Sequence, residues 1–92
     1  MFGPARVTNK PPWYVYILKC ADNSLYTGIT IDVKRRIDEH NNDNKLAAKY
    51  TRVRRPVKLV YQEELESRSL ATKREKAIKK LKRDDKKLML TK

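Results

Sequence analysis

The sequence contains a single cysteine, Cys20, so no disulfide can form within the chain. Disulfide frameworks are features of oxidising compartments, and their absence here favours a cytoplasmic protein. Cys20 follows Tyr16 and Leu18 in an alternating strand pattern, and no nearby residue offers a base that would activate it. We therefore predict a packed thiol at this position and not a nucleophile.

Long apolar runs are also missing. No run approaches the roughly 18 residues that a membrane-spanning helix requires. Residues 1–12 lack the apolar core of a signal peptide, and their three prolines are typical of a flexible segment. Because 92 residues leave room for one domain, we expect a flexible N-terminal arm over residues 1–12, a single domain over residues 13–92 and no membrane partner.

Acidic residues are scarce: 11 of them face 23 basic residues, which gives a net charge of +12. Between residues 68 and 92, eleven basic residues face three acidic ones, and residues 45–58 contain six basic residues and no acidic one. A field of this sign attracts polyanions, and phosphate neutralisation supplies most sequence-independent affinity for DNA or RNA. The simpler alternative is a solvated basic surface. We predict a nucleic-acid-binding surface that includes Lys45, Lys49, Arg52, Arg54, Arg55 and Lys58.

Aromatic and β-branched residues predict strands over residues 13–20 and 25–30, and alternation predicts a third over residues 57–64. Both faces of the first strand are apolar, which is typical of a central strand. The turn residues Asp22-Asn23-Ser24 join the first two strands into a hairpin. If the connection has an odd number of residues, Tyr16 and Tyr26 share a face of the sheet.

Helix signals alternate with these strands. Asp32 can cap a helix that runs to about residue 40, and Ser67 or Ser69 can cap a second. Asp84-Asp85 begins a short last helix, and residues 45–56 form a basic loop with at most one helical turn. The predicted fold class is α+β: a three-stranded antiparallel sheet flanked by helices, in the order β-β-α-β-α-α.

The first predicted helix places Val33, Arg36, Ile37 and His40 on one face. Val33 and Ile37 are the expected buried pair, which carries Arg36 and His40 to the border of the core. An arginine there binds a phosphate group, or its stem covers the core while its head reaches water. His40 is either a functional group or a helix-end residue favoured by the helix dipole.

Gly28 interrupts the second strand, where glycine normally lowers stability. It marks either a β-bulge, the more frequent case, or a place where another backbone or a ligand comes close. Tyr14, Tyr16 and Tyr26 cluster near Trp13 in the predicted hairpin, and by themselves they indicate aromatic packing.

The joint spacing of these residues resembles the GIY-YIG nuclease domain. Tyr14-Val15-Tyr16 is followed after nine residues by Tyr26-Thr27-Gly28, then by Arg36 and His40, and then by Glu75 on the next long helix. Further stretches are similar to the stand-alone, single-domain members of that family, namely Arg35-Arg36, His40-Asn41, Lys49-Tyr50-Thr51 and Arg55-Pro56-Val57. The resemblance covers roughly residues 13–90.

The resemblance implies a metal-dependent endonuclease that hydrolyses DNA phosphodiester bonds, as in DNA repair or recombination. Tyr16 and Tyr26 would be paired active-site tyrosines, Arg36 would contact the scissile phosphate, and His40 would be an accessory active-site residue. Glu75 would hold one divalent metal, Mg²⁺ or Mn²⁺. If the family resemblance is set aside, Glu75 is interpreted as a solvated residue that pairs with Lys79 one turn away. Tyr16 could accept a proton from water if nearby positive charge lowered its pKa.

Three positions depart from the family pattern. Tyr14 stands where the first glycine is found, Ile29 stands where some members have lysine, and the asparagine that follows the glutamate helix has no counterpart. Two other functions fit the charge: a DNA- or RNA-binding module without cleavage, and an RNA-binding accessory protein. No sequence-reading module is evident, so we expect specificity to be absent or supplied by a partner protein.

Overall fold

The computed structural model of the protein describes residues 11–90. Its strands are β1 (Trp13–Lys19), β2 (Leu25–Thr30) and β3 (Lys58–Leu65). Its helices are α1 (Val33–Asn42), α2 (Lys49–Arg52), α3 (Arg68–Lys80) and α4 (Arg83–Leu90). The predicted flexible arm, except for its last two residues, lies outside the described part of the chain. None of the helices within residues 11–90 has the length and apolar composition to cross a membrane.

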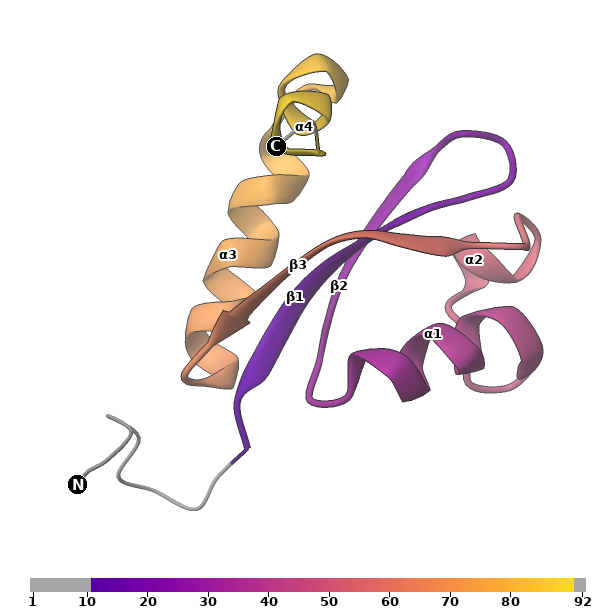
Figure 1. The fold of residues 1–92 in the computed structure, drawn as a ribbon, viewed down its shortest axis with the longest axis horizontal. Helices are drawn as coiled ribbons and strands as arrows, with labels where there is room; N and C mark the ends of the chain where they lie inside the picture. The colour runs from indigo at the N-terminus through magenta and orange to yellow at the C-terminus, as the bar shows by residue number, and fades with distance from the viewer. Residues whose placement is uncertain (1–10, 91–92) are drawn as a thin grey trace.

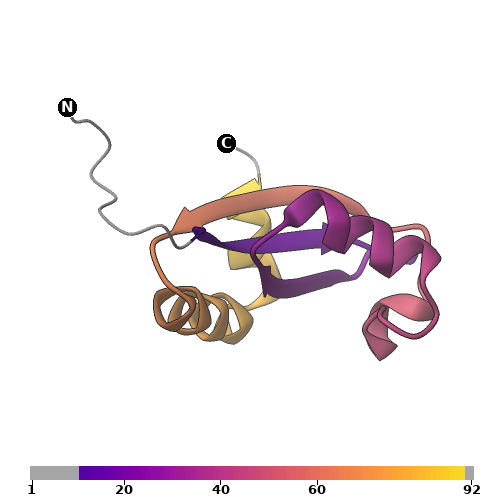
Figure 2. The same ribbon diagram turned by 90° about the horizontal axis from the view of Figure 1, so that it is seen from below.

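The three strands form one antiparallel sheet in the order β2-β1-β3, with β1 in the centre. Figure 1 shows α3 and α4 on one side of the crossing strands and α1 and α2 on the other, and the turned view in Figure 2 keeps α3 apart from α1 and α2. This arrangement confirms the predicted α+β class and element order. The helix α2 is the single turn expected in the basic loop.

The β1–β2 connection is a three-residue turn, residues 21–23, one position earlier than predicted. The Cys20 N–H donates to the Ser24 carbonyl at 2.9 Å, and Asn23 takes a left-handed φ of 68°, which asparagine tolerates. The odd length places Tyr16 opposite Gly28, and Leu18 opposite Tyr26. Tyr16 and Tyr26 therefore share one face of the sheet.

The central strand buries both of its faces, as its apolar composition predicted. On one face Val15 and Ile17 pack with Ala71 and Ile78 of α3. On the other face Tyr16, Leu18 and Cys20 form a second core with Val57, and Tyr26 and Ile37 pack against it. The Cys20 thiol is 3% exposed, which confirms the packed thiol.

The helix caps follow the sequence signals. Asp32 Oδ1 accepts from the Arg35 N–H at 3.0 Å, and Ser67 Oγ accepts from the Leu70 N–H at 3.2 Å. The predicted buried pair of α1 is wrong: Val33 and Ile37 are half-buried, and His40 is the buried residue of this helix. The C-terminal end of α1 packs against the sheet, and His40 is therefore buried in the core.

Candidate active site

Tyr16 reaches the outer edge of the sheet because Gly28 has no side chain. The two residues are directly opposite each other on β1 and β2. A Cβ atom at position 28 would lie 2.6 Å from Tyr16 Oη and 2.8 Å from Cζ, closer than side-chain atoms approach one another. Gly28 therefore marks a close approach, made by a ring of the same chain. The expected bulge is wrong at this position, because the irregularity in register lies instead in the pairing of β1 with β3.

His40 lies at the centre of the second core with no exposed surface. Its Nε2 atom is 2.8 Å from the hydroxyl of Tyr16, and its Nδ1 atom is 2.7 Å from the hydroxyl of Thr51 on α2. Burial and the nearby charge of Arg36 lower the pKa of His40 to about 4. The imidazole is therefore neutral near pH 7, with one nitrogen that donates and one that accepts.

Tyr26 of β2 packs against both rings, so that Tyr16, Tyr26 and His40 form one cluster. Its ring centroid is 5.2 Å from that of His40 and 6.4 Å from that of Tyr16. On its outer side it stacks on Tyr50, with centroids 6.0 Å apart, and the Arg54 guanidinium lies 3.9 Å from the centre of the Tyr50 ring. No role of its own was predicted for Tyr50, and nothing in its spacing indicates this stack.

Arg36 stands at the rim of the same cluster, with 24% of its side chain exposed. Its Nη1 atom donates to Glu39 Oε1 at 2.8 Å and to the Leu46 carbonyl at 2.7 Å. Its charge also lowers the pKa of the nearby Tyr16 hydroxyl. Burial favours the neutral form, but these partners outweigh burial and raise the pKa of Arg36, so the guanidinium stays charged.

The pKa of Tyr16 is raised, so the lowered pKa that would let this residue accept a proton from water by itself is not found. Burial is the largest cause, and the neighbouring Tyr26 adds to it. Arg36 acts in the opposite direction but is outweighed. The Glu75 carboxylate contributes to the rise as well, so it lies within electrostatic reach of the phenol. Tyr16 is accordingly a neutral hydroxyl that holds its proton firmly.

Glu75 projects from α3 with 20% of its side chain exposed, and its Oε2 atom is 3.3 Å from Lys79 Nζ. The ion pair expected from the i, i+4 spacing is present, but most of the Glu75 side chain is buried. Within residues 11–90 no group of three or more histidine, cysteine or acidic side chains gathers to hold a metal. A lone carboxylate fits Mg²⁺, which keeps several waters and binds through one or two carboxylates together with substrate phosphate.

The structure therefore brings four of the predicted residues into direct proximity, namely Tyr16, Tyr26, Arg36 and His40. Glu75 approaches the group from the other side of the sheet edge, at electrostatic range of Tyr16. Sequence analysis missed Thr51, although the Lys49-Tyr50-Thr51 stretch contributed to the family resemblance. No spacing rule connects Thr51 with His40, because the contact depends on how the loop folds back.

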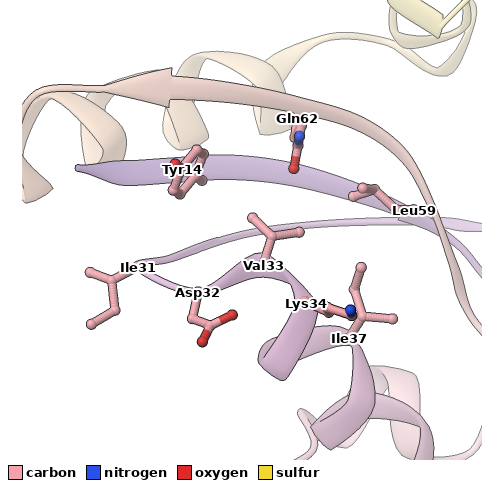
Figure 3. A pocket seen from close by; sticks show the side chains of 8 residues that line it. All are labelled: Tyr14, Ile31, Asp32, Val33, Lys34, Ile37, Leu59 and Gln62. Atoms are coloured by element: carbon pink, nitrogen blue, oxygen red, sulfur yellow. The ribbon is translucent and has the colours of Figure 1, made fainter. Parts of the chain in front are cut away.

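A hollow in the described structure lies away from this cluster. It has a volume of about 430 Å³ and lies between the start of α1 and the sheet. Figure 3 shows Val33 of α1 pointing toward Tyr14 and Gln62 of the strands. None of the five predicted active-site residues lines it. A smaller hollow of about 220 Å³ borders the cluster and is lined by Leu25, Tyr26, Thr27, Tyr50, Lys79 and Lys86.

The predicted nucleic-acid-binding residues divide into two groups. Lys45, Lys49, Arg52 and Lys58 are exposed, as binding residues must be. Arg54 and Arg55 are half-buried and are bound within the protein.

Arg54 pairs with Asp22 at 3.1 Å and donates to the Tyr50 carbonyl at 2.9 Å. Arg55 donates to the carbonyls of His40 at 2.6 Å and Asp43 at 3.1 Å, so it secures the C-terminal end of α1. Residue type and charge alone did not separate these two arginines from the exposed lysines.

Comparisons with known proteins identify the family of the chain. The GIY-YIG catalytic domain matches residues 12–88 of the chain. A UPF0213 protein from Desulfotalea psychrophila is 60% identical over 74 residues, which cover 80% of this chain and 66% of that protein. A UPF0213 protein from Staphylococcus aureus is 56% identical over 79 residues, which cover 86% of this chain and 93% of that protein.

Two solution structures resemble the fold. The UPF0213 protein BH0048 from Bacillus halodurans is 42% identical with a TM-score of 0.56, over 87% of this chain and 83% of that one. The protein EF2693 from E. faecalis is 42% identical with a TM-score of 0.58, over 88% of this chain and 85% of that one. By this combination of matched domain, sequence identity and fold, the chain belongs to the GIY-YIG nuclease family and is related to its UPF0213 proteins.

Proposed function

We propose that the protein is a metal-dependent endonuclease that hydrolyses DNA phosphodiester bonds. The observation that carries the proposal is the 2.8 Å contact between the Tyr16 hydroxyl and the Nε2 atom of a buried, neutral His40. A phenol bonded to a neutral imidazole, beside a charged arginine and a shielded carboxylate, is a set of groups suited to phosphodiester hydrolysis.

The Tyr16–His40 pair supplies a path for the proton of the attacking water. With its raised pKa, Tyr16 is not ionised and cannot act as a base by itself. If Tyr16 passes its own proton to His40 Nε2 while its oxygen receives one from water, the phenol does not need to ionise beforehand. His40 is neutral near pH 7 and has the lone pair that this transfer requires.

Arg36 is the proposed contact for the scissile phosphate. A guanidinium has five N–H groups in a fixed fork, and Nη1 alone makes the contacts to Glu39 and Leu46. The remaining N–H groups are left for Tyr16 and for a phosphate oxygen. Held at the rim with 24% exposure, Arg36 can stabilise the negative charge that develops in the transition state.

Glu75 is the proposed ligand of Mg²⁺ or Mn²⁺. The bound ion would act as a Lewis acid that stabilises the leaving oxygen. Lys79 pairs with the Oε2 atom of this carboxylate at 3.3 Å, which leaves Oε1 for a metal ion. Because a single carboxylate is a weak site, we expect firm metal binding only in the presence of DNA.

DNA is the proposed substrate, and the exposed residues Lys45, Lys49, Arg52 and Lys58 are the proposed phosphate contacts. The alternative of a binding module whose tyrosines stack on bases is supported less well. Tyr16 is 1% exposed, and the Tyr50 ring already stacks on Tyr26 and is contacted by the Arg54 guanidinium. A role in DNA repair or recombination stays a prediction.

The proposal is tested by a cleavage assay on duplex, nicked, branched and single-stranded DNA, with matched RNA strands, in Mg²⁺ and in EDTA. We expect cleavage of at least one DNA substrate in Mg²⁺ and none in EDTA. Binding to every substrate without cleavage of any would instead support the non-cleaving module.

A further inference from the structure

We propose that Thr51 is a positioning residue, which holds His40 in the tautomer with hydrogen on Nδ1 and leaves Nε2 free to receive the Tyr16 proton. The inference has two parts. The assignment of the tautomer rests on hydrogen bonds alone, whereas its catalytic consequence rests on the proposed function.

Thr51 is fully buried, together with its hydroxyl. Its oxygen is 2.7 Å from His40 Nδ1, and the hydroxyl donates to the Ala48 carbonyl at 3.0 Å. A hydroxyl has one hydrogen to donate. Since that hydrogen is directed to Ala48, the hydrogen between Thr51 and the imidazole has to come from His40 Nδ1.

The other end of the imidazole gives the same assignment independently. Arg36 lies near enough to lower the pKa of Tyr16, but a guanidinium has only donors and cannot accept the Tyr16 hydrogen. Tyr16 is 1% exposed, so its own hydrogen needs an acceptor inside the protein, and His40 Nε2 at 2.8 Å fills that role. With hydrogen on Nε2 instead, the Tyr16 hydrogen would be buried without an acceptor, which proteins avoid.

The hydrogen bonds therefore run in one direction, from Tyr16 through His40 and Thr51 to the Ala48 carbonyl. Thr51 can occupy its position because α2 is held against the end of α1: Arg52 Nη1 donates to the Asn44 carbonyl at 3.0 Å. A residue that fixes the tautomer of a proton acceptor leaves the acceptor lone pair aimed at the donor. The short helix α2 therefore positions Thr51 against His40, in addition to contributing positive charge.

The tautomer can be observed directly, because His40 is the only histidine in the chain. Long-range ¹H–¹⁵N NMR of the full chain, labelled at histidine, distinguishes a protonated from an unprotonated ring nitrogen. In the parent protein at pH 7 we expect hydrogen on Nδ1. Thr51→Val keeps the shape and removes the acceptor of the Nδ1 hydrogen, so that only the Tyr16 contact still favours this tautomer, and we expect part of the population to carry hydrogen on Nε2. Thr51→Ser should restore the parental spectrum.

A matched control is available at Thr27. It is 3% exposed, and its hydroxyl oxygen has no hydrogen-bond partner among the described residues. Thr27→Val therefore makes the same chemical change at another buried threonine and should leave the His40 spectrum unchanged. For cleavage, loss of a group that orients a catalytic residue typically costs about 10- to 100-fold. We expect that loss for Thr51→Val, with DNA affinity unchanged, and near-parental rates for Thr51→Ser.

A parent spectrum with hydrogen on Nε2 would overturn the tautomer assignment, even if Thr51→Val did not fold. A changed spectrum in Thr51→Val with a parental cleavage rate would overturn the catalytic part. If the parent protein cleaves no nucleic acid, the proposed function fails, and the NMR result still decides whether Thr51 sets the tautomer.

Discussion

Replacing Gly28 by alanine perturbs the centre of the site with a single methyl group. That methyl would lie 2.6 Å from Tyr16 Oη and 2.8 Å from Cζ. Carbon atoms are in optimal contact at about 3.5–4.0 Å, so the ring has to move by roughly 1 Å. The movement breaks the 2.8 Å bond between Tyr16 and His40, because both side chains are enclosed.

The magnitude follows from these contacts. Overpacking a well-packed interior costs about 1–3 kcal/mol, and losing one buried hydrogen bond costs about 1 kcal/mol. We therefore expect Gly28→Ala to lower the free energy of unfolding by about 2–4 kcal/mol. An ordinary strand glycine gives the opposite sign, because alanine there is better by roughly 0.5–1 kcal/mol. Misplacement of Tyr16 by about 1 Å should also slow cleavage by about 100-fold.

Urea denaturation of Gly28→Ala, Tyr16→Leu and the double variant measures the interaction between the two positions. Leucine lacks the outer half of the phenol ring, so the alanine methyl should cost little in that background. Equal destabilisation by Gly28→Ala with either residue at position 16 would refute the reasoning, as would a stabilised single variant.

Three further predictions concern His40 and the arginines. The pKa of His40 falls from about 6.5 to about 4 on folding, so the folded protein favours the neutral imidazole. The stability that depends on this neutral form is fully present above pH 6.5 and is lost as the pH falls to 4. Denaturation as a function of pH should show a drop of about 3 kcal/mol over this range, and His40→Asn should lack it. Arg55→Ala should lower the unfolding free energy by about 2 kcal/mol, because Arg55 holds the carbonyls that end α1. The exposed Lys49→Ala removes the same charge and should change stability by less than about 0.5 kcal/mol; equal effects would contradict the division of the basic residues. Arg36→Ala should slow cleavage by about 100- to 1,000-fold while DNA affinity, measured at fixed salt, stays nearly parental, since the net charge changes only from +12 to +11; a parental rate would remove Arg36 from the site.

The strands, the helices and the hairpin turn could be predicted from the sequence because they depend on local signals. Apolar residues on both faces marked β1 as the central strand, and Asp32 and Ser67 marked the starts of two helices. The turn at Asn23 set the parity that puts Tyr16 and Tyr26 on one face. Each of these signals operates over a few residues, which is why boundaries were found to within one or two positions.

The interior of the site depends on contacts that no local pattern encodes. Burial of His40 requires the end of α1 to meet α2, and the role of Thr51 follows only from that meeting. The pKa of Tyr16 moved in the unexpected direction, because the sequence shows nearby charges but not the loss of water around a ring. Arg55 looked like its basic neighbours until the carbonyls that it binds were placed.

Metal-dependent cleavage at a site that contains Glu75 can be tested by a comparison of three proteins. Single-turnover cleavage of DNA is measured in Mg²⁺ and in EDTA for the parent, Glu75→Gln and the exposed control Glu66→Gln. We predict cleavage by the parent and by Glu66→Gln in Mg²⁺ only. Glu75→Gln should lose most of the rate while binding DNA equally well or more tightly, because its net charge rises from +12 to +13. A parental rate for Glu75→Gln in Mg²⁺, or parental cleavage in EDTA, would contradict the account.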